Sequence, residues 1–323
     1  MSNYQVLSEA RGQVLSEARG QVPDQELMSP GHVACPGCGA PMAVRYALKA
    51  LGENTVLIVV ASCWSIIAGP FPYTAVQVPL LHTLFATGGS VASGVKAGLE
   101  ARGLKDTTVL TLAGDGGTFD IGIQALSAAV ERNEDFIYMC YDNEAYMNTG
   151  IQRSSATPWG AWTTTTPVKH PKEQPKKDMV AIMAAHRIPY TATATVAYPE
   201  DLIRKVQKAK GIRGSKFIHV LSPCPSGWKS EPAQSVLLSR LAVQTRIFPL
   251  YEVEHGEKYT INVWPKERVP VTEYMKLQGR FAHLGPEALA QIQENVDREW
   301  EKLVAKAGVT HLNREDAKNA KGT

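Results

Sequence analysis

Four cysteines in this 323-residue chain occupy positions of the kind that metal sites use. Cys35 and Cys38 form a C-x₂-C pair in the Gly/Pro-rich segment HVACPGCG, where backbone N–H groups are free to hydrogen-bond sulfur. Cys63 and Cys224 each follow an apolar run that is typical of a buried strand, so both should emerge where a strand ends. Four thiolates suit either a [4Fe–4S] cluster or a zinc ion, and the spacing alone leaves both open.

A glycine-rich turn has the pattern of a diphosphate site. The segment AGDGGTFD ends an apolar run and opens a helix. Gly114, Gly116 and Gly117 let the backbone approach a ligand, and the free N–H groups at a helix start favour a diphosphate. An ordinary glycine turn before a helix has the same pattern, so the turn alone does not decide between the two.

An aspartate and an asparagine are spaced so that they can meet at one metal ion. Asn143 follows Asp115 after an interval that one helix and one strand, a single crossover unit, would fill. If the two strands are neighbours, they lie about 4.8 Å apart. One Mg²⁺ could then be reached by both side-chain oxygens, since Mg²⁺ prefers oxygen ligands and keeps phosphates as co-ligands. A backbone carbonyl just beyond Asn143 would add a further ligand.

The elements that must position these residues alternate along the chain. Runs rich in β-branched residues predict buried strands at 55–62, 107–114, 136–143, 189–196 and 216–223. Helical patterns are expected at 89–102, 119–132, 178–187 and 199–210, with a final helix near 286–306. Strand and helix in alternation indicate an α/β fold with a doubly wound, mostly parallel sheet, which collects ligands at the carboxyl ends of its strands.

The chain divides into three predicted regions. Residues 1–26 contain the octad QVLSEARG twice and are expected to be a mobile tail. Residues 27–230 form the predicted α/β domain, in which the long loop 145–177 is expected to be functional. Residues 231–323 are irregular and predict an extension that wraps the domain or contacts a partner.

Composition excludes several classes of protein. The formal net charge is +3 and the basic residues are scattered, which gives no reason to expect nucleic acid as a partner. No apolar run is long enough for a membrane span and no secretory signal is visible, so a cytoplasmic protein is expected. Five cysteines, an odd number, argue against a disulfide framework and favour metal or redox chemistry. Cys140, inside a predicted strand, is interpreted as a core residue.

Together the two motif sets resemble one known family. GDG followed one crossover later by Asn143, with the run DNEAYMNTGIQRS, resembles the thiamine-diphosphate motif of the pyruvate:ferredoxin oxidoreductases. The cysteine spacing resembles the cluster ligands of the same family, and the likeness extends from about Leu27 to Leu284. The resemblance implies a sheet of the thiamine-diphosphate-binding type and the cofactors thiamine diphosphate, Mg²⁺ and one [4Fe–4S] cluster.

The resemblance also assigns roles to individual residues. Asp115, Asn143 and the carbonyl of Ala145 would hold Mg²⁺. Asn148 would face the substrate and donate a hydrogen bond to a developing oxyanion, although simple loop capping is the alternative. The cysteines Cys35, Cys38, Cys63 and Cys224 would hold the cluster. The residues expected to line the cofactor are Ala40, Cys63, Gly114, Asp115, Gly116, Gly117, Asn143, Glu144, Ala145, Tyr146, Met147 and Asn148.

As a family member the chain would be the β subunit of a larger enzyme. Other subunits, of α, γ and δ type, would carry further clusters and a glutamate that activates the cofactor, so the isolated chain should be inactive. The expected reaction is the oxidative decarboxylation of a 2-oxoacid, with electrons passed through the proximal cluster to ferredoxin and the acyl group to coenzyme A. Pyruvate is the first choice of substrate, and oxalate, without coenzyme A, or another 2-oxoacid is the next.

Two other functions fit parts of the same pattern. The first is a thiamine enzyme without redox function, such as a simple decarboxylase, in which the four cysteines bind a structural zinc. The second is a non-enzymatic, zinc-stabilised assembly subunit. Trp64, which follows a cluster cysteine, is expected to shield the cluster or pack in the core rather than narrow the substrate pocket.

Overall fold

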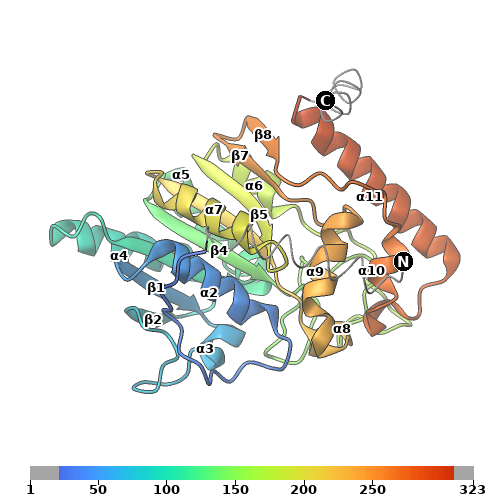
Figure 1. The fold of residues 1–323 in the computed structure, drawn as a ribbon, viewed down its shortest axis with the longest axis horizontal. Helices are drawn as coiled ribbons and strands as arrows, with labels where there is room; N and C mark the ends of the chain where they lie inside the picture. Colours follow the sequence, from blue (N-terminus) through green and yellow to red (C-terminus); the bar gives the residue numbers. More distant parts are fainter. Residues whose placement is uncertain (1–21, 309–323) are drawn as a thin grey trace.

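The computed structural model describes residues 22–308 and contains an eight-stranded sheet at its centre (Figure 1). The strand order is β2-β1-β3-β4-β6-β5-β7-β8, and the first six of these strands run parallel. The strands are β1 (Thr55–Val60), β2 (Leu80–Thr83), β3 (Thr108–Gly114), β4 (Phe136–Asp142), β5 (Tyr190–Thr195), β6 (Ser215–Leu221), β7 (Tyr251–Glu254) and β8 (Lys258–Ile261). The predicted doubly wound, mostly parallel sheet is confirmed.

Helices cover both faces of this sheet, as a parallel sheet requires. The helices are α2 (Gly39–Leu51), α3 (Cys63–Ile67), α4 (Gly88–Ala101), α5 (Ile123–Glu131), α6 (Met179–Ala185), α7 (Pro199–Lys210), α8 (Pro225–Trp228), α9 (Ser235–Gln244), α10 (Val271–Met275) and α11 (Pro286–Lys306). A π-helical turn (Gly116–Asp120) precedes α5, and short 3₁₀ turns span Pro232–Gln234 and Gly279–Phe281.

Alternate residues of each central strand enter two separate cores. Leu110 and Leu112 of β3 pack with α2 and α7 on one face, whereas Val109 and Ala113 pack with α4, α5 and α6 on the other. Because both faces are covered, β4 is buried along its whole length. This burial explains why the central strands are continuous apolar runs in the sequence rather than alternating ones.

All five predicted strands and the predicted helices are present, but several elements were missed. Helix α2 begins directly after the C-x₂-C segment, and β2 is a four-residue strand at the edge of the sheet. The β7–β8 hairpin pairs antiparallel with β5, so residues beyond 231 continue the same sheet. Short or edge strands bury little and leave a weak hydrophobic pattern, which is why the sequence did not reveal them.

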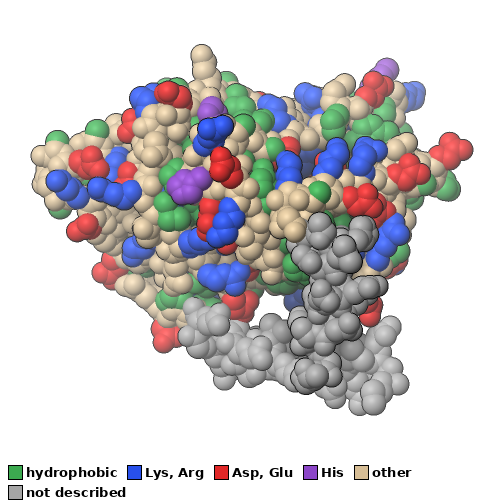
Figure 2. All heavy atoms as spheres, turned by 90° about the horizontal axis from the view of Figure 1, so that it is seen from above, with side chains coloured by type: hydrophobic (Ala, Val, Ile, Leu, Met, Phe, Trp, Pro, Cys, Tyr) green, Lys and Arg blue, Asp and Glu red, His purple; other side chains and the backbone are tan. Residues whose placement is uncertain are grey.

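The predicted tail 1–26 falls mostly outside the described residues. Its last residues contact α2, where Lys49 donates to the carbonyls of Pro23, Asp24 and Gln25 and Glu26 pairs with Arg45. No helix within residues 22–308 is long and apolar enough to cross a membrane. On the face drawn in Figure 2, acidic and basic side chains lie side by side over much of the surface.

One glycine on α4 is required by the packing of this layer against α5. A Cβ built on Gly89 would lie 2.6 Å from the carbonyl oxygen of Ala125, whereas a Cβ on Gly94 in the same helix meets nothing within 4 Å. Gly89→Ala should therefore lower the free energy of unfolding by about 1–3 kcal/mol through overpacking. Gly94→Ala should be neutral or stabilising by up to about 1 kcal/mol, because alanine favours helix. Urea unfolding of the full chain measures both, and equal effects would contradict the packing argument.

Candidate functional site

The two residues predicted to share a metal ion leave neighbouring strands at the same edge of the sheet. Strands β3 and β4 pair in parallel, with Gly114 opposite Tyr141. Asp115 follows the end of β3, and Asn143 follows the end of β4. The adjacency on which the predicted pairing depended is therefore present.

Three oxygen atoms face one another at this edge. The side-chain oxygen of Asn143 lies 2.9 Å from the carbonyl oxygen of Ala145 and 3.0 Å from Oδ1 of Asp115. Oxygen atoms do not donate hydrogen bonds to each other, so this arrangement calls for a cation unless the Asn143 amide turns over. In an octahedral Mg²⁺ site with bonds of about 2.1 Å, neighbouring ligand oxygens lie about 3.0 Å apart. The three oxygens thus have the spacing of adjacent magnesium ligands.

Asp115 is a buried carboxylate in need of a positive partner. Asp115 is 1% exposed, and Ser154 Oγ donates to Asp115 Oδ2 at 2.5 Å. Burial raises the pKa of Asp115 well above its ordinary value, and the nearby Asp142 carboxylate raises it further. A divalent cation at the three oxygens would offset this cost, because a buried charge is stable only when it is paired or coordinated.

The glycine-rich turn beside this carboxylate is closely packed against aromatic side chains. A Cβ built on Gly116 would lie 2.3 Å from the ring of Tyr146, so only glycine fits there. Tyr146 is fixed in turn, because its hydroxyl donates to Asp120 Oδ2 at 3.0 Å and its backbone pairs with Gln152. Gly117 is buried beside Phe85 and the turn continues into α5. The missing side chain at Gly116 therefore lets the Tyr146 ring pack directly against the turn.

The run after β4 changes from buried to exposed within a few residues. Glu144 and Ala145 are buried, Met147 is half-buried, and Asn148 is exposed. Glu144 has a φ of 68°, a left-handed conformation that few residues other than glycine adopt. Asn148 thus lies at the surface end of the loop, and its predicted role toward substrate stays a prediction.

The four predicted cluster cysteines come together at the same edge. The loop with Cys35 and Cys38 lies against the segment that carries Cys224, since Gly39 N donates to Pro223 O at 2.9 Å. Cys63 begins α3 directly after β1. Burial, the three neighbouring cysteines and Asp115 together raise the pKa of Cys63 to about 12. Because β1 and β3 pair in parallel, Cys63 emerges beside Asp115 at this edge.

Backbone N–H groups point at two of these sulfurs. Ala40 donates to Cys38, whose pKa is raised by burial to about 12, and Gly227 donates to Cys224 Sγ at 3.5 Å. In the part of the chain that the structure describes, no three His, Cys, Asp or Glu side chains are arranged to share a single metal ion. A tetrahedral zinc site would bring its sulfurs to about 3.8 Å from one another. Cys140 is fully buried within β4, as expected of a core residue.

Several residues around the site had no signal in the sequence. Trp228 Nε1 donates to the carbonyl of Asn143 at 2.8 Å, and Lys176 Nζ lies 2.5 Å from Asp142 Oδ2. Burial alone would raise the pKa of Asp142, but Lys176 and His219 lower it to about 2. These contacts join residues far apart in sequence, so no local spacing could reveal them. Trp64 is fully buried in the core, which agrees with the packing interpretation.

Comparison with known proteins shows the family of this chain. The family model "Thiamine pyrophosphate enzyme, C-terminal TPP binding domain" matches residues 61–220. The ketoisovalerate oxidoreductase subunit VorB of Pyrococcus horikoshii is 52% identical over 292 residues, which are 87% of this chain and 94% of that relative. The pyruvate synthase subunit PorB of Methanothermobacter thermautotrophicus is 51% identical over 287 residues, which are 87% of this chain and 99% of that relative.

A solved structure shares the fold at lower identity. The 2-oxoglutarate:ferredoxin oxidoreductase from Magnetococcus marinus matches with a TM-score of 0.54 and 23% identity over 68% of this chain and 82% of that one. The match to VorB and PorB spans nearly their whole length, and the family model covers the strand ends that carry the three oxygens. This chain belongs to the β subunits of the 2-oxoacid:ferredoxin oxidoreductases, within the thiamine-pyrophosphate-binding enzymes.

Proposed function

We propose that this β subunit binds thiamine diphosphate through Mg²⁺ at the edge formed by β3 and β4, and passes electrons from it to a [4Fe–4S] cluster on the four cysteines. The proposal is supported by three oxygens that face one another, from Asp115, Asn143 and Ala145. The side-chain oxygen of Asn143 is as far from the other two as neighbouring ligand oxygens are in an octahedral Mg²⁺ site. Family membership supplies the thiamine cofactor, and this geometry suggests where its diphosphate is held.

Each part of the turn has a distinct task in this proposal. The Asp115 carboxylate neutralises part of the metal charge, while Asn143 and Ala145 provide neutral oxygens from the loop after β4. The glycines at 114, 116 and 117 expose backbone N–H groups to the diphosphate. When bound, the cofactor supplies a nucleophilic carbon and a sink for the electron pair that decarboxylation releases. The chain itself contributes binding, orientation and the nearby thiols.

The four cysteines suit an electron acceptor because of where they lie. Strands β1 and β3 pair in parallel, so Cys63 after β1 and Asp115 after β3 emerge side by side at the same edge. A structural zinc needs no such proximity, whereas an electron acceptor does. Backbone N–H groups directed at Cys38 and Cys224 would stabilise thiolate ligands and tune the cluster potential.

The site on this chain is half of a complete one. Asn148 is exposed at the rim of the loop, where a partner subunit and the substrate would meet it. We infer that the partner subunits supply the glutamate that activates the cofactor and the further clusters that lead to ferredoxin. The substrates would be a 2-oxoacid and coenzyme A. A cytoplasmic location follows from the need for reduced thiolates.

Two substrates are favoured by the relatives. PorB proteins are named for pyruvate and VorB proteins for ketoisovalerate, and this chain is equally similar to both, at 51% and 52% identity. We therefore retain pyruvate as the first candidate and add a branched-chain 2-oxoacid as the second. Oxalate stays a prediction from the sequence alone.

The metal assignment is tested by removing one ligand. Asp115→Ala in the assembled complex should abolish Mg²⁺-dependent binding of thiamine diphosphate, because the site loses its charged ligand. Isothermal titration calorimetry measures the binding. Asp106→Ala, which alters an exposed loop aspartate, is the matched control and should bind normally. Undiminished binding by the Asp115 variant would refute the assignment.

The cluster assignment is tested by metal analysis of anaerobically purified complex. Cys224→Ser should remove about four iron atoms and four sulfides per β subunit, because one ligand of a [4Fe–4S] cluster is lost. Cys140→Ala removes a cysteine that is buried in the core and should leave the iron content unchanged. Stoichiometric zinc in a colourless β subunit would instead support the structural-zinc alternative.

The reaction is tested by ferredoxin reduction with a panel of substrates. The complex should reduce ferredoxin with pyruvate or a branched-chain 2-oxoacid, and only when coenzyme A is present. The panel includes 2-oxoglutarate and oxalate, each with and without coenzyme A. Reduction with oxalate and no coenzyme A would overturn the substrate choice, and no reduction with any 2-oxoacid would overturn the function.

A further inference from the structure

Two carboxylates flank the proposed metal ligand Asn143 and are turned away from it. Asp142 precedes Asn143 and is fully buried, and Glu144 follows it with 3% of its surface exposed. Their oxygens are absent from the three-oxygen group, which takes its only carboxylate from Asp115. Two unpaired carboxylates here would compete for the same cation or force the loop to open, so their partners matter for the site.

Lys176 bridges both of these carboxylates. Its Nζ lies 2.5 Å from Asp142 Oδ2 and 2.7 Å from Glu144 Oε1. The same ammonium group thus joins the residues on either side of Asn143 from a distant position further along the chain. Lys176 stands near the end of the long loop 145–177, which the sequence predicted to be functional.

The remaining oxygens of the two carboxylates are also occupied. Arg280 Nη2 lies 2.5 Å from Glu144 Oε2, and Asp142 Oδ1 accepts from Glu144 N. His219 Nε2 lies 2.7 Å from Asp142 Oδ2, the oxygen that Lys176 also contacts. Two carboxylates therefore face two fixed positive charges, from Lys176 and Arg280, and the group is balanced without the metal. Because buried ion pairs persist only when the charges and hydrogen bonds are matched, this balance favours one arrangement of the loop.

The backbone between the carboxylates is held by the same contacts. Asp142 Oδ1 accepts from Glu144 N at 2.9 Å, which helps Glu144 to keep its left-handed φ of 68°. Thr157 Oγ1 donates to the Glu144 carbonyl at 2.7 Å. Arg280 lies over the ring of Trp228, 4.2 Å from its centroid, and Trp228 donates to the Asn143 carbonyl. The Asn143 side chain and the Ala145 carbonyl are left to face Asp115.

We propose that Lys176 is a positioning residue that orients the metal-binding loop by clamping Asp142 and Glu144. This inference rests on the proposed magnesium site and names the residue that shapes it. The ion pairs of Lys176 are with the two residues that flank Asn143, and its charge also lowers the pKa of Asp115. Without Lys176 the oxygens of the loop would be less well ordered for Mg²⁺, so the affinity for the metal should fall.

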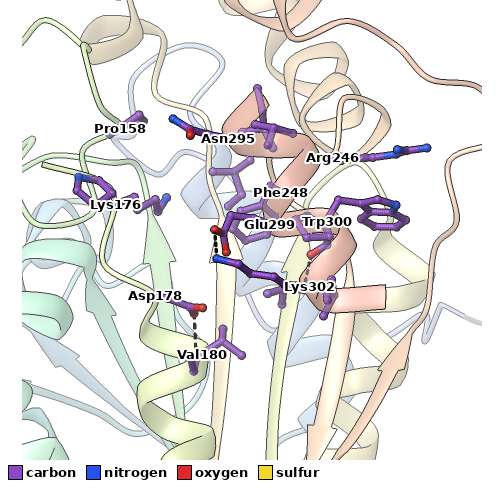
Figure 3. Close-up of a pocket in the computed structure, with 18 of the residues that line it drawn as sticks. Pro158, Lys176, Asp178, Val180, Arg246, Phe248, Asn295, Glu299, Trp300 and Lys302 are labelled. Atoms are coloured by element: carbon purple, nitrogen blue, oxygen red, sulfur yellow. Dashed lines mark hydrogen bonds and ion pairs between the residues drawn. The ribbon is translucent and has the colours of Figure 1, made fainter. Parts of the chain in front are cut away.

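Lys176 is reached from a cavity of about 590 Å³, which makes it suitable for substitution. In Figure 3 Lys176 and Asp178 lie on one side of this cavity and residues of α11, including Asn295 and Lys302, lie on the other, with Phe248 between them. The Lys176 side chain keeps 24% of its surface exposed to this space. A replacement side chain can therefore settle without displacing the core.

The test is Lys176→Met in the complete complex, with metal affinity as the readout. Mn²⁺ replaces Mg²⁺ and its binding in the presence of thiamine diphosphate is followed by electron paramagnetic resonance. The half-saturating Mn²⁺ concentration should rise about 10- to 100-fold, the usual effect of losing a residue that orients a metal ligand. Lys302→Met removes a charge from the same cavity, where Lys302 pairs with Glu299, and should change this concentration less than about twofold.

A second variant covers the case in which the methionine variant fails to fold. Lys176→Gln keeps two N–H donors for the two carboxylates but removes the charge, and it should raise the half-saturating concentration about 10-fold. At saturating metal and cofactor, turnover should recover in both variants, because the substituted residue contacts neither substrate nor cofactor. An intact iron content checks that the cysteine region is unchanged.

Each outcome has a defined meaning. Folded Lys176 variants with unchanged Mn²⁺ affinity would overturn the inference, as would an equal loss of affinity in Lys302→Met. If the unsubstituted complex binds thiamine diphosphate without any divalent metal, the proposed magnesium site itself fails. Because that control does not involve Lys176, the two failures are distinguishable.

Discussion

The site on this chain depends on one buried carboxylate. Asp115 stands at the end of β3, is 1% exposed, and has a pKa raised by burial and by Asp142. Such a group is costly unless a positive charge compensates it. Around it the chain places two neutral oxygens, from Asn143 and Ala145, at the spacing of metal ligands. The loop after β4 and the surrounding ion pairs hold the oxygens of Asn143 and Ala145 near the Asp115 carboxylate, in an arrangement that suits a cation.

The parallel sheet explains why two kinds of chemistry are neighbours. Strands β1, β3, β4 and β6 run in the same direction, so the residues that follow them emerge at one edge. Cys63 follows β1, and Cys224 follows β6, on either side of the two strands that lead to Asp115 and Asn143. The nearness of Cys63 and Cys224 to the proposed cofactor site is therefore a consequence of topology.

The contacts that organise the loop are of another kind. Lys176, Arg280 and Trp228 come from segments that are remote from β4 in the sequence, and Arg280 is 136 residues away from its partner Glu144. Lys176 and Arg280 balance the charges of Asp142 and Glu144, and Lys176 and Glu144 also line the cavity beside α11. The proposed site separates two tasks: Asp115 would bind the metal, whereas Asp142 and Glu144 are neutralised by Lys176 and Arg280.

The sequence by itself determined the class of fold and predicted the main candidate site residues. Continuous β-branched runs revealed the buried strands, and the interval from Asp115 to Asn143 revealed one crossover, because periodicity and spacing are local properties. The short strands β2, β7 and β8 were missed because their patterns are weak, and the helix α2 was missed although its apolar face is well defined. Only the tertiary structure decided that β3 and β4 are neighbours, that Asn143 and Ala145 turn their oxygens toward Asp115, and that Lys176 bridges Asp142 and Glu144. Those facts depend on strand order and on packing between distant segments, which no local pattern encodes.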